Sequence, residues 1–193
     1  FWVYSQGMST FTRYMVLGCV LATFLLSAWV YPVAPASFPI HWNGQGVADG
    51  FAPKIIGLFL LPVLLLAMTL LLAWVFNSEP NASMLTPGRA SVDGMFVCIA
   101  LFFVYLHVVC VVCALRPSTA FVPALVFGFS FFAVGLGFFM RGLPRNFVAG
   151  IRTPWTLASD EVWNATHRVG GTVLMVAGVF GLVGIAFPAY GVW

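Results

Sequence analysis

The chain has 193 residues, of which 62% are hydrophobic and only 7% are charged, with a formal net charge of +3. Proteins on average carry roughly 25% charged residues, so a soluble fold of this composition would expose large apolar patches and aggregate. The composition therefore excludes an ordinary soluble protein and indicates an integral membrane protein. The basic residues form no dense cluster, which excludes a nucleic-acid-binding surface.

Apolar runs of about 20 residues predict transmembrane helices. Five such runs are present, over residues 14–33, 55–76, 92–115, 119–140 and 169–187. The sequence therefore predicts an all-α integral membrane protein with about five transmembrane helices. The first run is also compatible with a signal peptide, because Ala34-Pro35-Ala36 resembles a cleavage site, but the run is long for that role.

A polar loop is expected between the first two runs, over residues 34–54. Two prolines in it oppose helix formation, and Asn43-Gly44 is a tight-turn signal. The candidate binding residues of this loop are His41, Asn43, Asp49 and Lys54. The alternative is that these side chains only hold the loop to the membrane rim. His41 and Asp49 alone are too few ligands for a metal, so we predict neither a metal nor another cofactor.

The third run carries His107 at mid-span, where ionisable residues are candidates for function. A lone histidine is more often a buried hydrogen-bonding residue than a proton relay or a ligand of haem or chlorophyll. Cys110 and Cys113 match a CxxC pattern, but hydrocarbon disfavours thiolates, so we expect apolar packing roles for all four cysteines. We expect no acidic residue inside the spans, which disfavours a proton-coupled transporter.

A second polar segment, residues 141–168, separates the last two runs. Ser159 precedes Asp160 and Glu161 and can cap a helix, with both acids favourable in its first turn. We therefore predict a short interfacial amphipathic helix over about 159–168, which lies at the membrane surface until the chain turns into the last span at Gly170-Gly171. An extended stretch is expected before this helix.

The same segment is a candidate binding surface, because Trp, Arg and His together suit contacts with peptides or lipid headgroups. Its candidate residues are Arg152, Thr153, Pro154, Trp155, Glu161, Trp163, His167 and Arg168. The alternative is a helix that only anchors the last span. No side chains in the chain suggest a nucleophile with an activating base, so we predict no enzyme.

Orientation follows from the positions of the eight Lys and Arg residues. With five spans, Lys54 and Arg116 lie on one side of the membrane and the other basic residues on the opposite side. The positive-inside rule then places the N-terminus and the 141–168 segment in the cytoplasm, and the 34–54 loop outside.

Two motifs are similar to known sequences. The stretch Gly150-Ile151-Arg152-Thr153-Pro154-Trp155-Thr156-Leu157, followed by Glu161-Val162-Trp163 and Thr166-His167-Arg168, closely resembles the signature of the SdpI family. The stretch Pro39-Ile40-His41-Trp42-Asn43, followed by Asp49-Gly50 and Lys54, resembles a two-span domain of unknown function often found N-terminal to it. The resemblance implies a two-span part over residues 1–90 and an SdpI-like three-span part over residues 91–193.

SdpI-family proteins are bacterial multi-span membrane proteins, named for an immunity protein against a secreted toxic peptide. The resemblance implies a non-enzymatic protein of the bacterial cytoplasmic (inner) membrane, with a role in immunity or signalling. Its implied partners are membrane lipid and either a toxin peptide or a regulator. Members commonly have a sixth span, which the five apolar runs do not supply.

An accessory subunit of a larger respiratory or photosynthetic complex is the alternative function. The 20 phenylalanines and the many glycines in the spans favour lateral packing against neighbouring subunits. A transporter is a third and weaker alternative.

Overall fold

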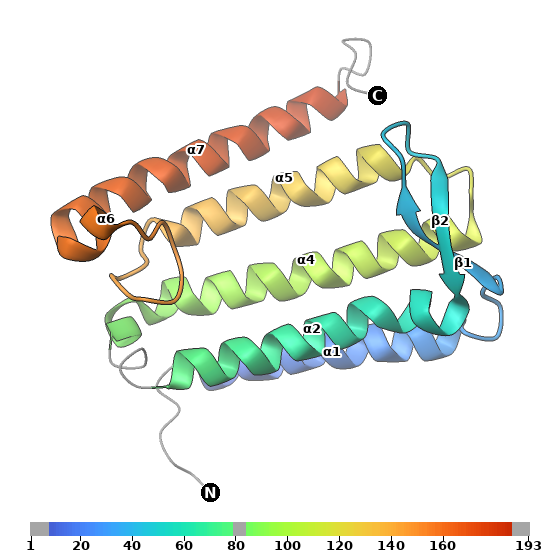
Figure 1. Ribbon diagram of the computed structural model, residues 1–193, viewed down its shortest axis with the longest axis horizontal. Coiled ribbons are helices and arrows are strands. Elements are labelled where there is room, and N and C mark those ends of the chain that lie inside the picture. Colours follow the sequence, from blue (N-terminus) through green and yellow to red (C-terminus); the bar gives the residue numbers. More distant parts are fainter. Residues whose placement is uncertain (1–7, 79–83, 187–193) are drawn as a thin grey trace, which may run out of the picture.

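Five long helices lie side by side and a β-hairpin covers one end of them in the computed structural model, which describes residues 8–78 and 84–186 (Figure 1). The long helices are α1 (Thr10–Val30), α2 (Lys54–Asn77), α4 (Arg89–Leu115), α5 (Phe121–Met140) and α7 (Asp160–Ala186). The short elements are β1 (Ser37–Trp42), β2 (Ala48–Pro53), the 3₁₀ helix η1 (Thr86–Gly88) and α6 (Pro154–Ala158).

All five long helices are long and apolar enough to cross a membrane, which confirms the predicted helical membrane fold with five spans. Except for α5, the observed helices begin before the predicted runs, because hydropathy marks the apolar part of a helix and misses its polar first turns. Residue 187, the predicted last residue of the fifth span, lies outside the described part of the chain.

The predicted loop over residues 34–54 is an antiparallel hairpin. Its strands pair from Ser37 opposite Pro53 to Trp42 opposite Ala48, with irregular register around His41. The Asn43 side chain organises the turn, because its Oδ1 accepts the backbone N–H groups of Gln45 and Val47, each at 3.0 Å. The prolines had argued only against helix, and the turn signal is what identifies the hairpin.

The prediction of a separate surface helix over 159–168 is wrong, because these residues are the first turns of one continuous helix, α7. Gly170 and Gly171 do not break the helix. They allow close packing, since a Cβ atom on Gly171 would overlap the carbonyl oxygen of Gly137 in α5. The extended stretch expected before it is also wrong in part: Thr153 caps the short helix α6, which begins at Pro154.

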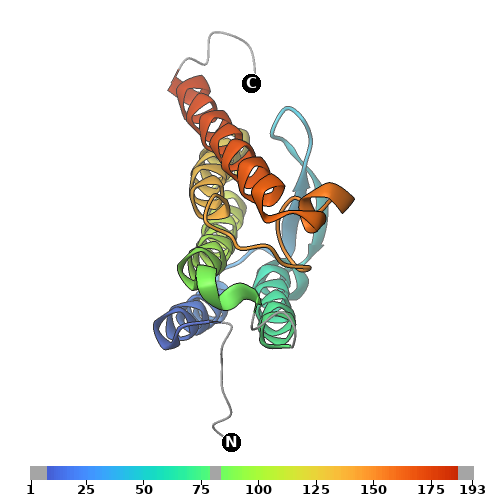
Figure 2. The same cartoon turned by 90° about the vertical axis from the view of Figure 1, so that its left-hand side faces the viewer.

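Three of the long helices form a compact bundle, and the other two pack against one side of it. Helices α1, α2 and α4 pack together around a core of buried aliphatic and aromatic side chains that includes Val16, Leu65, Val92 and Phe96. Helix α5 packs on α4, and α7 packs mainly on α5, so that α7 lies farthest from α1 when the molecule is viewed from the end (Figure 2). Most of the surface of α7 is left for lipid.

An acidic residue does lie in a span, contrary to our expectation. Asp93 occupies the second turn of α4 and accepts the backbone N–H of Ser9 at 3.0 and 3.2 Å. Ser9 in turn caps α1 by accepting the N–H of Thr12. This carboxylate therefore fixes the start of α1 near one end of the bundle.

The Gly137–Gly171 contact predicts different effects for two glycines of one helix. Replacement Gly171→Ala places a methyl group against the α5 backbone and is expected to destabilise the protein by about 1–3 kcal/mol. Replacement Gly184→Ala is the matched control, because a Cβ atom at this position would meet no neighbouring element within 4 Å. Thermal unfolding in mild detergent measures both, and equal midpoints for the two variants would contradict the close contact.

Candidate functional site

Residues 141–168, which we call the cap, close the end of the bundle opposite the hairpin (Figure 1). Trp163 is its central side chain and has no exposed surface. The indole Nε1–H donates to the carbonyl oxygen of Leu143 at 2.8 Å, and the ring belongs to the same core as Val92 and Phe96 of α4. Trp163, a side chain of α7, thus holds the segment that follows α5 against the bundle.

His167 lies one turn after Trp163, and the two rings stack at 4.0 Å between centroids. Its Nε2 accepts the backbone N–H of Ile151 at 2.9 Å, so Nδ1 must carry the proton, which it donates to the carbonyl oxygen of Trp163 at 2.8 Å. Gly150 lies against Nε2 with a φ of 103°, and any Cβ there would overlap the ring. The neutral imidazole therefore fixes the Gly150–Ile151 turn.

Two further polar side chains shape the cap. Asn146 is buried, and its Oδ1 accepts the N–H groups of Val148 and Ala149 at 2.8 and 2.7 Å. Thr153 and Thr156 form a reciprocal capping box at the start of α6. These local bonds satisfy backbone groups that the loop would otherwise leave unpaired near the membrane.

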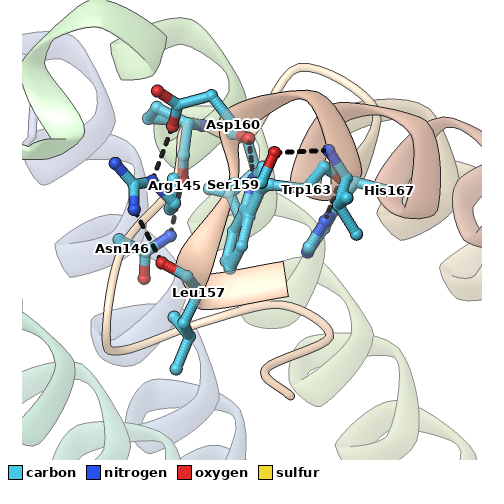
Figure 3. A network of polar contacts seen from close by, with 10 residues as sticks. Arg145, Asn146, Leu157, Ser159, Asp160, Trp163 and His167 are labelled. Atoms are coloured by element: carbon cyan, nitrogen blue, oxygen red, sulfur yellow. Dashed lines mark hydrogen bonds and ion pairs between the residues drawn. The ribbon is translucent and has the colours of Figure 1, made fainter. Parts of the chain in front are cut away.

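Arg145 joins α6 to the start of α7 (Figure 3). Its Nε donates to Asp160 Oδ1 at 2.6 Å, and its Nη1 donates to the carbonyl oxygen of Leu157 at 2.6 Å. Ser159 Oγ accepts the N–H of Val162, as the sequence predicted for a capping residue. Through Arg145, the segment that follows α5 is therefore bonded both to α6 and to the first residue of α7.

The predicted binding residues of the cap separate into two groups. Trp163 and His167 are fully buried and hold the fold of the cap. The exposed members are Arg152, Pro154, Trp155, Glu161 and Arg168, and Thr153 is half-buried. Sequence analysis missed Gly150 and Asn146 as cap-forming residues; the turn preference of Asn was the available signal for the second.

At the other end, the hairpin brings two predicted residues together. His41 Nδ1 and Asp49 Oδ1 are 2.5 Å apart across the strands, and both side chains are largely exposed. Lys54 lies apart from them, because its Nζ donates to the carbonyl oxygen of Tyr31 and sits 4.5 Å from the centre of the Tyr31 ring. Asn43 is occupied in the turn.

The hairpin also contacts the C-terminal half of the chain. The Trp42 ring stacks on Phe121, the first residue of α5, at 3.9 Å and 6°. The two stacked rings border an apolar groove of about 340 Å³, which lies between β1 and helices α2, α4 and α5. Its walls include Phe38, Ile40, Leu61, Cys110 and Phe129.

His107 is buried among helices α1, α2 and α4. Its Nε2 lies 3.0 Å from Ser27 Oγ, which also reaches the carbonyl oxygen of Leu58 at 2.7 Å. This arrangement is the predicted buried hydrogen bond, and it links three helices. Among the described residues, no three His, Cys, Asp or Glu side chains form a group that could hold a metal ion.

These features define the class of the protein: a multi-span helical membrane protein with a structured hairpin at one end and a structured cap at the other. Comparison with known sequences narrows the class. Residues 142–193 match the SdpI/YfhL protein family, and residues 18–66 match a domain of unknown function, DUF1648. The chain is an SdpI-like membrane protein, which confirms the resemblance seen in both motifs.

Two relatives from Bacillus subtilis (strain 168) support this assignment. The chain is 27% identical to "Immunity protein SdpI" over 161 residues, which cover 82% of this chain and 74% of that protein. It is 41% identical to "Uncharacterized membrane protein YbgB" over 59 residues, which cover 30% of this chain and 65% of that protein. No solved structure gives a significant match.

We expect replacement by phenylalanine to affect stability differently at the two tryptophans of the cap. Trp163→Phe keeps an aromatic ring but leaves the buried Leu143 carbonyl without its donor, which is expected to destabilise the protein by about 1–3 kcal/mol. Trp155→Phe, at a side chain that is 64% exposed, is the control and is expected to change stability by less than about 0.5 kcal/mol. Denaturation midpoints in mild detergent test both, and an unchanged Trp163→Phe variant would show that the indole bond contributes nothing.

Proposed function

We propose that this protein is a non-enzymatic immunity protein, which protects a bacterial cell from a membrane-acting peptide toxin. The observation that carries the proposal is the similarity to an immunity protein over 82% of the chain. The exposed His41–Asp49 pair at one end and the exposed Arg152 at the other support a binding role, because hydrogen bonds hold these side chains in place. Rigid presentation lowers the entropy lost on binding.

We propose the hairpin as the surface that meets the toxin. The hairpin carries the exposed His41–Asp49 pair and also the apolar side chains of Ile40 and Phe51, which are 43% and 55% exposed. A membrane-active peptide offers both charged and apolar groups, and this surface can contact both kinds. The stack of Trp42 on Phe121 holds the hairpin in place.

The proposed orientation places the hairpin outside the cell and the N-terminus and cap in the cytoplasm of a bacterium with this protein in its cytoplasmic membrane. The hairpin and the cap lie at opposite ends of the bundle, so they face opposite sides of the membrane (Figure 1). Lys54 lies at the hairpin end, whereas Arg141, Arg145, Arg152 and Arg168 lie in the cap, a distribution that supports this orientation through the positive-inside rule. The cap is then the surface available to a cytoplasmic regulator in a signalling role.

We also propose two functional parts, residues 1–90 with the hairpin and residues 91–193 with the cap. The family matches over 18–66 and 142–193 fall on either side of this boundary, which supports the division. Helix α4 packs against α1 and α2, so the two parts share one core.

A protection assay tests the immunity role. A toxin-sensitive Bacillus subtilis strain without its own immunity protein is expected to grow in the presence of the toxic peptide when it expresses this chain. His41→Ala and Asp49→Asn are expected to reduce protection, because each removes one partner of the exposed pair. Gln45→Ala, an exposed substitution in the same turn, is the control and is expected to protect fully.

Membrane fractions establish that every variant is inserted to the same level. Failure of the inserted wild-type chain to protect would reject immunity to this toxin. Full protection by both pair variants would instead remove the hairpin pair from toxin recognition while leaving the immunity role intact.

The alternative function, an accessory subunit, draws support from the thin coverage of α5 and α7, whose apolar spans are only 17% and 11% buried within the chain. Another protein could cover these faces as well as lipid does. Purification from native membranes in mild detergent discriminates the two functions. A stoichiometric complex with other subunits supports the accessory role, and recovery of this chain alone contradicts it.

A further inference from the structure

Three apolar side chains of the cap are exposed although they lie outside the spans. Phe147, Ile151 and Trp155 are 55%, 37% and 64% exposed, respectively. Exposed apolar groups on a transmembrane helix face lipid and need no other explanation, but these three belong to the connection between α5 and α7. A rigid loop that displays such side chains indicates a specific environment for them.

The exposed face of α7 shows where the hydrocarbon layer begins. Its exposed residues up to Arg168 are Asp160, Glu161, Val162, Asn164, Ala165 and Arg168, and the exposed positions after it include Val169, Thr172, Val173, Val176 and Phe180. Val169 and Phe180 are 64% and 71% exposed, as lipid-facing side chains are. Arg168 is the last charged residue of this face, so we place the start of the hydrocarbon between Arg168 and Val169.

The connection between α5 and α7 comes back to the level of this boundary at Ile151. A Cβ atom added to Gly170 would lie 2.7 Å from Ile151 Cδ1 and 3.2 Å from the Cε of Met140, the last residue of α5. Ile151 therefore lies beside the membrane boundary of α7, and the end of α5 lies there too. The 27 residues of α7 span about 40 Å, about 10 Å more than the hydrocarbon layer, so its first turns extend beyond the hydrocarbon.

Helix α6 rises from this boundary alongside the extra turns of α7. It begins next to Ile151, whose carbonyl oxygen accepts the Thr156 hydroxyl at 2.8 Å, and it ends beside Asp160. Trp155 is the second residue of α6 and therefore lies close to the level at which the hydrocarbon begins. The headgroup layer on each side of a bilayer is about 5–8 Å thick, and Trp prefers that layer.

Arg152 supplies a cation at the same place. Its guanidinium is exposed, and one nitrogen, Nη1, donates to the carbonyl oxygen of Phe147. Within the described part of the chain the acidic partners in ion pairs are Asp49 and Asp160, which pair with His41 and Arg145. The remaining guanidinium donors of Arg152 form no ion pair with a carboxylate of residues 8–78 or 84–186, and they suit a phosphate, which accepts two parallel bonds from arginine.

We propose that the edge of the cap formed by Phe147, Ile151, Arg152 and Trp155 is a binding site for the headgroup of an anionic phospholipid. The apolar side chains lie at the acyl boundary, Trp155 lies among the headgroups, and Arg152 binds the lipid phosphate. A protein partner is disfavoured at this edge because its height places it against the bilayer. The exposed Glu161 at the start of α7 lies on the water side of the boundary and stays available to a regulator.

The first experiment measures the height of the edge in lipid. Single cysteines at positions 155, 161 and 173, in a chain whose four natural cysteines are replaced by alanine, receive nitroxide labels in bilayer nanodiscs. The label at 155 is expected to show oxygen and nickel accessibilities between those of 161, in water, and 173, in hydrocarbon. A label at 155 with the same nickel accessibility as the label at 161 would overturn the proposal and leave the edge open to a protein.

The second experiment measures lipid preference. Spin-labelled phosphatidylglycerol and phosphatidylcholine report the relative association of each lipid with the protein in nanodiscs. Arg152→Gln is expected to reduce the preference for phosphatidylglycerol about fivefold, the value of one basic residue near a membrane surface. Arg152→Lys is expected to keep most of it. Arg116→Gln, an exposed substitution of the same charge at the hairpin end, is the control and is expected to keep all of it.

An unchanged preference in Arg152→Gln would overturn the phosphate contact. A loss in Arg116→Gln as large as that in Arg152→Gln would also overturn it, because the preference would then depend on overall charge. Neither experiment uses the toxin, so its outcome is independent of the immunity assay.

Discussion

The structure of the cap depends on one requirement: backbone groups that come near the hydrocarbon must find hydrogen-bond partners within the protein. Apart from the short helix α6, the chain between α5 and α7 is irregular, so its backbone groups cannot pair with one another as those of a helix do. The indole of Trp163 and the imidazole of His167 supply the missing partners from the side of α7. The most distinctive side chains of the family motif are therefore buried and structural, and the exposed residues between them are the ones available for binding.

The same logic explains which predictions followed from sequence. Five spans are visible because each apolar run satisfies its backbone internally as a helix, a local property that hydropathy reports well. The course of the polar residues depends on tertiary contacts instead. Gly170-Gly171 was interpreted as a turn, because the sequence alone does not show that Gly137 of α5 packs at the same point.

The candidate residues show the same division. The pairing of His41 with Asp49 required the hairpin register, and only Asn43-Gly44 gave a local signal of it. The burial of His107 was predictable from its place in a span, whereas its partner Ser27 is 80 residues away in sequence. Asp93 was overlooked because an acid near the end of an apolar run changes its mean hydropathy little, yet it holds Ser9, the capping residue of α1, which lies 84 residues earlier in the sequence.

The position of α7 on the flank has a consequence for biosynthesis. Helices α1, α2, α4 and α5 leave the ribosome first and can assemble with the hairpin before α7 is made, since α7 packs mainly on α5 and α6. The Trp163 indole then arrives as the last core group and closes the loop at Leu143. A chain that stops before α7 would leave the Leu143 carbonyl without this donor, so the cap closes only when the last helix is in place.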